Sequence, residues 1–240
     1  MHLDPARTVR VTARDELLFD GGETVLVDGA ERKATSKDGT WALPGIPGLG
    51  VHELVWGGVP LEVEVVGAHY ATRSDLEAYG SKNGDGFADR ERYTDADVEA
   101  CIQAAEESIE RGCRRSFVSR AVDVSLTPGL NELPVVDARE LRAPDGAARL
   151  VGDRQAVADA ACVCTVVYGH HMPAKVKMAV LQLAASYLRP RSQAENVRGQ
   201  SSEGVYISYT LATGGPGSWT GLPLVDAVIE EHRSRRVIVG

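Results

Sequence analysis

Two segments with helical periodicity constrain the fold of this chain most strongly, because each is followed by a polar, arginine-bearing stretch instead of another packed element. They span residues 94–112 and 173–188. The apolar positions that recur at helical spacing, which we expect to form the helix core, are Val98, Ile102, Ile109, Val176, Val180, Leu183 and Tyr187. The pattern predicts two amphipathic helices, and it makes the stretches after them candidates for contact with a neighbouring molecule.

The ends of these helices carry recognisable signals. Thr94 is placed to cap the first helix, with Asp97 three residues later and Arg111 near the other end, as the helix dipole favours. Pro173 opens the second helix, where a missing N–H costs nothing. A third helix is expected to begin at Pro223, and residues 205–210 are expected to form a strand between the second and third helices.

Residues 1–68 predict a small β-sandwich-like domain. Short β-rich segments at residues 9–12, 24–27, 51–55 and 60–66 are separated by Asp-Gly and Gly-Gly turn signals. Trp41 and Trp56 are expected to pack in or near its core. Residues 69–93 predict a linker with a single helical turn and a flexible loop.

The remaining residues, 94–240, predict one helical domain with an inserted β excursion and extended arms, so the fold class expected is α+β. The excursion is predicted from strand-like segments at residues 121–126, 133–136 and 160–168. Cys162 and Cys164 lie in the last of these, and we expect reduced thiols that point to opposite faces.

Composition excludes several classes of function. The net charge is −8 and aromatic residues make up 5% of the chain, which disfavours both tight duplex binding and recognition of ligands by stacking. Residues 161–240 are the basic part, with eight lysines and arginines against five acidic residues. No signal-peptide-like or membrane-spanning run occurs in the sequence, so we expect synthesis and assembly in the host cytoplasm, with no membrane partner.

Enzymatic motifs are missing from the sequence. It contains no nucleophile elbow, no His-Glu-x-x-His, no phosphate-binding glycine loop and no Cys-x-x-Cys pair, so we expect no enzyme, no cofactor and no metal. His170 and His171 are adjacent and are expected to form the polar turn before Pro173. The Asn83-Gly-Asp-Gly run lacks the ligand spacing of a calcium-binding loop.

Three stretches, in this order, resemble a known family. They are Tyr93-Thr94-Asp95-Ala96-Asp97 through Cys113-Arg114-Arg115-Ser116-Phe117, then Met172-Pro173-Ala174-Lys175-Val176-Lys177 through Ser186-Tyr187, and finally Gly204-Val205-Tyr206-Ile207-Ser208-Tyr209-Thr210 with Leu222-Pro223 and Arg233-Ser234-Arg235-Arg236. Together they resemble the head-to-tail connector, or adaptor, proteins of long-tailed bacteriophages. The resemblance covers about the last 150 residues and does not extend to residues 1–68.

This resemblance implies a structural protein of the virion neck. Such a protein forms a homo-oligomeric ring, usually dodecameric, under the portal vertex, meets the next tail or stopper protein, and continues the DNA channel, with transient contact to packaged double-stranded DNA. The first arm, the loop from Arg189 to Gly204 with the strand that follows it, would face the channel or the tail through Arg189, Arg191, Arg198, Tyr206 and Tyr209. Residues 235–239, the second arm, would dock on the portal protein through Arg235, Arg236, Val237, Ile238 and Val239.

Two alternatives from other classes remain open on the residues alone. A β-sandwich module that binds a ligand or a surface would use Trp41 and Trp56 and treat the helices as a scaffold. A helical DNA-binding regulator would use the basic last third of the chain. Saturable binding of glycans or DNA by the purified chain would favour these alternatives.

Overall fold

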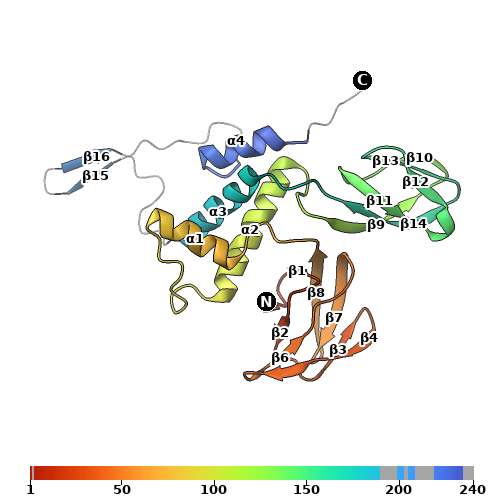
Figure 1. Ribbon diagram of the computed structural model, residues 1–240, viewed down its shortest axis with the longest axis horizontal. Coiled ribbons are helices and arrows are strands. Elements are labelled where there is room, and N and C mark those ends of the chain that lie inside the picture. The colour runs from red at the N-terminus through yellow and green to blue at the C-terminus, as the bar shows by residue number, and fades with distance from the viewer. Residues whose placement is uncertain (2, 190–198, 203–204, 209–218, 235–240) are drawn as a thin grey trace. The chain divides into compact units, whose positions relative to one another are not determined.

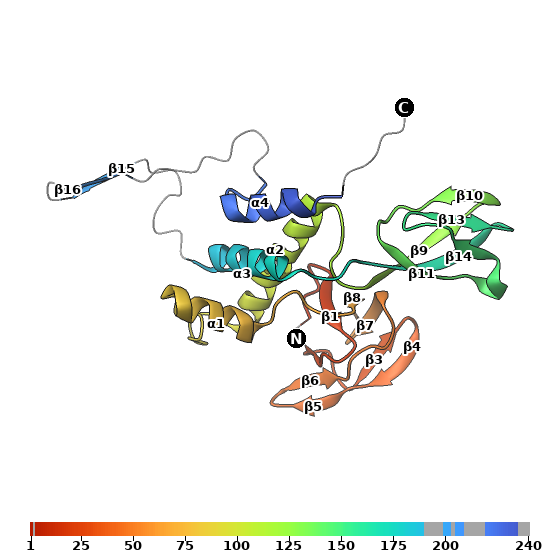
Figure 2. The same cartoon turned by 45° about the horizontal axis from the view of Figure 1, so that its top comes forward.

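The computed structural model describes residues 1, 3–189, 199–202, 205–208 and 219–234. Over this part of the chain the fold is mixed α/β, with four α-helices and several small sheets (Figures 1 and 2). Contacts divide it into two units. The first comprises Met1–Tyr70 and Arg114–Pro173, and the second comprises Ala71–Cys113 and the described part of Ala174–Arg233.

This division differs from the domain boundaries expected from the sequence, which joined residues 94–240 into one helical domain. The inserted β excursion groups with the amino-terminal strands instead of with the helices. The physical reason is a set of polar links between the two β parts. Gly67 N–H donates to the Ser119 carbonyl at 2.8 Å, and Glu64 of the first part accepts a hydrogen bond from Arg120 of the second at 2.6 Å.

The first β module, residues 1–70, contains two sheets. Its strands are β1 (Val9–Thr12), β2 (Leu17–Phe19), β3 (Thr24–Val27), β4 (Ala30–Lys33), β5 (Thr35–Lys37), β6 (Thr40–Leu43), β7 (Gly50–Trp56) and β8 (Val59–Val66). The larger sheet has the order β1-β8-β7-β3-β4 and the smaller one β2-β6-β5. β1 and β8 run parallel, whereas the other pairs are antiparallel.

One core is shared by both sheets of this module. Leu17 and Leu43 from the smaller sheet and Leu54 and Trp56 from the larger one are all buried in it. Trp56 also donates its indole N–H to the Gly22 carbonyl at 2.6 Å. The expected packing of the tryptophans is confirmed for Trp56, which is fully buried, and Trp41 packs against the core while partly exposed.

The second β module, residues 114–173, is built from two three-stranded sheets, β10-β13-β12 and β11-β14-β9. Its elements are β9 (Arg120–Leu126), β10 (Gly129–Glu132), β11 (Ala138–Arg142), the 3-10 turn η1 (Pro144–Gly146), β12 (Ala148–Leu150), β13 (Gln155–Ala158) and β14 (Cys162–Tyr168). The predicted strand at 133–136 is wrong, because this segment connects β10 to β11. Leu133 is nevertheless buried in the core of the module, and Pro134 lacks the N–H that a sheet requires.

The cysteines of β14 also differ from the sequence expectation. Their sulfur atoms lie 3.4 Å apart, so Cys162 and Cys164 share one face of the strand. Side chains two residues apart on a strand point to the same side, and the expectation of opposite faces was wrong for that reason. Burial raises the pKa of the Cys164 thiol to about 11, with a further contribution from its hydrogen bond with Cys162, which favours the protonated thiol.

The helical unit contains α1 (Arg73–Asn83), α2 (Asp95–Cys113), α3 (Ala174–Leu188) and α4 (Pro223–His232), together with the hairpin strands β15 (Gly199–Ser202) and β16 (Val205–Ser208). α3 packs against α1, α2 and α4 (Figures 1 and 2). The packing of α2 on α4 is close. A Cβ atom added at Gly112 would lie 2.8 Å from a methyl carbon of Ile229.

The predicted helices are confirmed within one or two residues, but α1 is longer than the single turn expected. Thr72 caps its start in a reciprocal arrangement with Asp75, and Gly84 ends it in the left-handed conformation (φ 78°). The strand expected at residues 205–210 is present as β16, and its partner β15 lies in a stretch expected to be irregular. None of the described helices is long and apolar enough to cross a membrane.

Candidate assembly surfaces

The residues expected to form the helix core lie as follows. Those at least 95% buried are Val98, Ile102, Ile109, Val176, Val180 and Leu183. Tyr187 is 42% exposed, and its hydroxyl lies 3.3 Å from the Ser108 hydroxyl on α2. The apolar stripe of α3 therefore ends before its last turn, where the tyrosine ring lies at the surface and its polar end faces a polar partner.

The start of the first arm is fixed to the helical unit by a two-point ion pair. Arg189 donates from Nε and Nη2 to the two carboxylate oxygens of Asp85, at 3.1 and 2.7 Å. The hydrogen bond that the Arg189 guanidinium donates to Asp85 raises its pKa above the ordinary value. Arg189 was assigned from the sequence to the channel or the tail, but in the structure it pairs with the loop after α1.

A second set of contacts lies at Trp219, the first described residue after residue 218. Asp226 accepts hydrogen bonds from the backbone N–H of Trp219 (3.2 Å) and from the backbone N–H (2.9 Å) and hydroxyl (2.8 Å) of Thr220. The guanidinium of Arg233 lies over the Trp219 ring at 4.8 Å. Because Asp226 lies in the first turn of α4, its charge also complements the helix dipole. Both ends of residues 190–218 are thus held on the same helical unit.

Several residues of the predicted sites fall outside the part of the chain that the structure describes. Arg191, Arg198 and Tyr209 of the first arm lie outside the described residues, as do Arg235, Arg236, Val237, Ile238 and Val239 of the second arm. Tyr206 belongs to β16 and faces Ser201 in the register of the hairpin.

A surface that the sequence analysis missed lies on the first β module. Val51, Val55 and Leu26 are 58%, 41% and 39% exposed, and Val55 is directly opposite Leu26 on the neighbouring strand. Residues of one parity on a strand share a face. Leu54 and Trp56 are buried on the other face, so the alternation along β7 could have predicted an apolar outer face.

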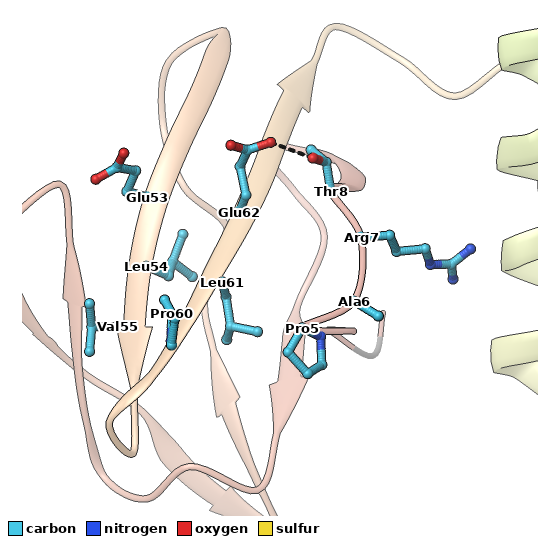
Figure 3. Close-up of a pocket in the computed structure, with 10 residues that line it drawn as sticks. All are labelled: Pro5, Ala6, Arg7, Thr8, Glu53, Leu54, Val55, Pro60, Leu61 and Glu62. Atoms are coloured by element: carbon cyan, nitrogen blue, oxygen red, sulfur yellow. Dashed lines mark hydrogen bonds between the residues drawn. The ribbon is translucent and has the colours of Figure 1, made fainter.

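Two carboxylates stand on this outer face. Glu53 on β7 and Glu62 on β8 are exposed and directly opposite in the strand register. They line a groove of about 440 Å³, together with Pro5, Ala6, Arg7, Thr8, Leu54, Val55, Pro60 and Leu61 (Figure 3). The Thr8 hydroxyl donates to Glu62. Figure 3 shows the segment Pro5–Thr8 beside β8, with the Arg7 side chain directed away from the two carboxylates.

The groove follows a strand edge. β1 pairs with β8 only from Val63 onward, because Val9 is its first paired residue. On that side the portion of β8 from Val59 to Glu62 has no strand partner among the described residues, while on its other side it pairs with β7. The groove therefore combines an open backbone edge, apolar side chains and two carboxylates. We call it the β8 groove.

The histidine pair lies at the junction that precedes α3. His170 Nδ1 lies 2.9 Å from the His171 carbonyl, and its ring lies edge-on to Phe117 with a centroid distance of 6.5 Å. The described residues contain no group of three or more histidine, cysteine, aspartate or glutamate side chains arranged to hold a metal ion.

Comparison with known proteins yields matches only among solved structures. No family model matches the chain, and no curated protein matches it. A chain from the neck of an empty gene transfer agent (GTA) particle is 20% identical with a TM-score of 0.41, over 61% of this chain and 82% of that chain. A chain from the neck of a native GTA particle, computed with C12 symmetry, is 18% identical with a TM-score of 0.42, over 70% and 93%. Similarity at this level does not by itself define a shared fold.

Proposed function

We propose that this chain is a structural, non-enzymatic protein of the virion neck, a head-to-tail adaptor. It forms a ring that joins the portal to the next tail or stopper protein and continues the DNA channel. The observation that carries the proposal is the anchoring of residues 190–218 at both ends, by Arg189 with Asp85 and by Thr220 with Asp226. These contacts fix the base of an arm on a packed helical unit, in the part of the chain whose motif order resembles the connector family.

A closed ring of identical subunits needs two different surfaces on each copy. In this proposal the packed helical unit supplies one surface, and the two arms supply the segments that meet a neighbour. We expect the dilute isolated chain to be monomeric and the ring, dodecameric by resemblance, to assemble on the portal.

Contact with DNA in the channel is proposed to be weak. Arg189 is neutralised by Asp85, which leaves Arg191 and Arg198 as the cations of the first arm. A modest number of phosphate contacts gives a small dependence on salt and does not hold the passing duplex tightly.

Electron microscopy of purified particles tests the proposal. Density for this chain is expected as a ring between head and tail, and antibody labelling is expected at the same place. A particle whose neck lacks this chain would contradict the central claim, whatever the chain binds in isolation.

Deletion of residues 235–240 tests the second arm. The described residues end at Ser234, and the cores of both units lie within them, so we expect the circular dichroism spectrum and unfolding midpoint to be unchanged. In infected cells we expect tailless heads. Normal virions from this deletion would remove the second arm from the proposed assembly.

A further inference from the structure

The β8 groove has the properties of a slot for one extended peptide. The edge of β8 from Val59 to Glu62 is unpaired on the groove side, and the segment Pro5–Thr8 forms the opposite wall (Figure 3). An exposed strand edge binds an added strand through backbone hydrogen bonds, and flanking pockets select its side chains. Val55 and Pro60 provide apolar surface for such side chains. Because Pro60 has no N–H, an added strand would pair with the carbonyl groups and the remaining N–H groups of this edge.

The charges of the groove specify a cationic occupant. Glu53 and Glu62 are directly opposite across β7 and β8, an arrangement that destabilises a sheet through like-charge repulsion. Among the described residues neither carboxylate forms a salt bridge. A cation placed between them would relieve the repulsion, and the apolar surface beside them would favour aliphatic side chains next to that cation.

One segment of this chain matches both requirements. Residues 235–239 read Arg-Arg-Val-Ile-Val, with two cations followed by three β-branched aliphatic residues and no acidic residue. β-branched residues favour the extended conformation of a strand. The segment follows directly on the last described residue, Ser234, which comes two residues after α4 ends.

We propose that the β8 groove binds residues 235–239 of a neighbouring copy as an added strand, with the arginines at Glu53 and Glu62. The choice of a neighbouring copy rests on the proposed ring, because a tail and a groove are the two different surfaces that such a ring needs. The receptor of the second arm is then another subunit, in place of the portal expected from the sequence.

Peptide binding tests the groove itself. A synthetic peptide, Arg-Arg-Val-Ile-Val-Gly, is titrated by calorimetry into the full chain carrying R235E and R236E, which disables its own tail. We expect saturable binding that weakens with added salt, and a loss of at least about tenfold in affinity when E53K and E62K are added. The matched control, E91K with D159K, makes the same charge change at two exposed positions outside the groove and should leave binding unchanged.

Absence of binding, or binding that E53K and E62K leave unaltered, would overturn the proposal and leave the second arm free for the portal. These results do not depend on particles. A chain missing from the neck would remove the proposed function while leaving peptide binding intact, so the two failures are distinguishable.

Sedimentation velocity tests whether the tail comes from a neighbouring copy. At rising concentration we expect wild-type chains to associate and both the groove variant (E53K, E62K) and the tail variant (R235E, R236E) to stay monomeric. A mixture of the two variants should associate again. The reversed tail of the tail variant meets the reversed groove of the groove variant, and the unchanged tail and unchanged groove also carry opposite charges. The tail variant could bind the peptide while wild-type chains neither bind it nor associate. In that outcome each wild-type tail occupies the groove of its own chain, and the assignment to a neighbour is overturned.

Discussion

The core of the first β module holds a fully buried tryptophan, Trp56, whereas the α2–α4 contact of the helical unit depends on a glycine, Gly112. The β module is built around large side chains, among them Trp56, Leu17 and Leu43, all essentially inaccessible to solvent. In the helical unit, small residues let the helices approach, as where Gly112 on α2 faces Ile229 on α4. The comparison predicts that removal of side-chain volume is costly at Trp56 and that addition of volume is costly at Gly112.

The largest effect is expected from Trp56→Ala in the β module. The change removes the largest fully buried side chain, its ring contact with Phe19 (5.8 Å) and its hydrogen bond to Gly22. We expect a loss of about 3–5 kcal/mol in the unfolding free energy of the module, measured by urea denaturation. Trp41→Ala is the matched control, because Trp41 is only partly buried. Equal losses for the two variants would contradict a core centred on Trp56.

An intermediate effect is expected from Gly112→Val in the helical unit. A Cβ atom at this position meets Ile229 at 2.8 Å, and a valine adds two further methyl groups. Overpacking of this kind costs about 1–3 kcal/mol, measured by urea denaturation followed by circular dichroism at the helical band. Ala104→Val on the exposed face of α2 is the control and should cost only the small difference in helix propensity. A Gly112→Val chain as stable as this control would show that the α2–α4 contact can open without cost.

The smallest expected effect is a loss of stability at low pH. Burial tends to raise the pKa of Asp75 in the helical unit, but hydrogen bonds from Lys177 and Thr72 outweigh it and hold the pKa below its ordinary value. Asp15 in the β module has a lowered pKa as well, since the bonds from His69 and Thr12 outweigh its desolvation. A lowered folded-state pKa contributes stability above the unfolded pKa, and this contribution is lost as pH falls from about 4 toward the folded value.

The measurement is urea denaturation between pH 6 and pH 2 of the wild type and two variants. Asp75→Asn should flatten the acid dependence of the helical signal. Asp15→Asn should flatten that of tryptophan fluorescence, recorded with Trp219→Phe in every chain so that Trp41 and Trp56 of the β module are the only tryptophans. Each change is expected to be below about 1 kcal/mol, because both carboxylates are partly exposed. A variant that flattens both signals equally would show that the two units unfold as one.

The sequence predicts local elements well where short-range signals agree. Thr94 caps α2 as expected, with its hydroxyl bonded to Asp97, and Pro173 stands just before the first residue of α3. Apolar spacing then locates the buried stripe from Val98 to Ile109. Local signals cannot show which strands share a core, so the grouping of β9 to β14 with the first β module could not be predicted.

The candidate surfaces are less predictable, because they depend on residues far apart in the chain. The partner of Arg189 is Asp85, 104 positions away, and no pattern near either residue indicates the pair. The β8 groove depends on where β1 begins to pair with β8, which follows from register alone. The sequence indicates only that Val51 and Val55, which lie at alternate positions of β7, share an apolar face.

The division of the chain into units also sets an order of events during synthesis. The first β module is encoded by one continuous stretch, Met1–Tyr70, whereas the helical unit is assembled from Ala71–Cys113 and Ala174–Arg233, with the second β module between them. Synthesis proceeds at about 5–20 residues per second, and nascent domains fold as they leave the ribosome. The first module is therefore complete while α2 still lacks α3 and α4. For the several seconds needed to make the second β module, the apolar stripe of α2 is without α3 and α4, the two helices with which it has its main contacts.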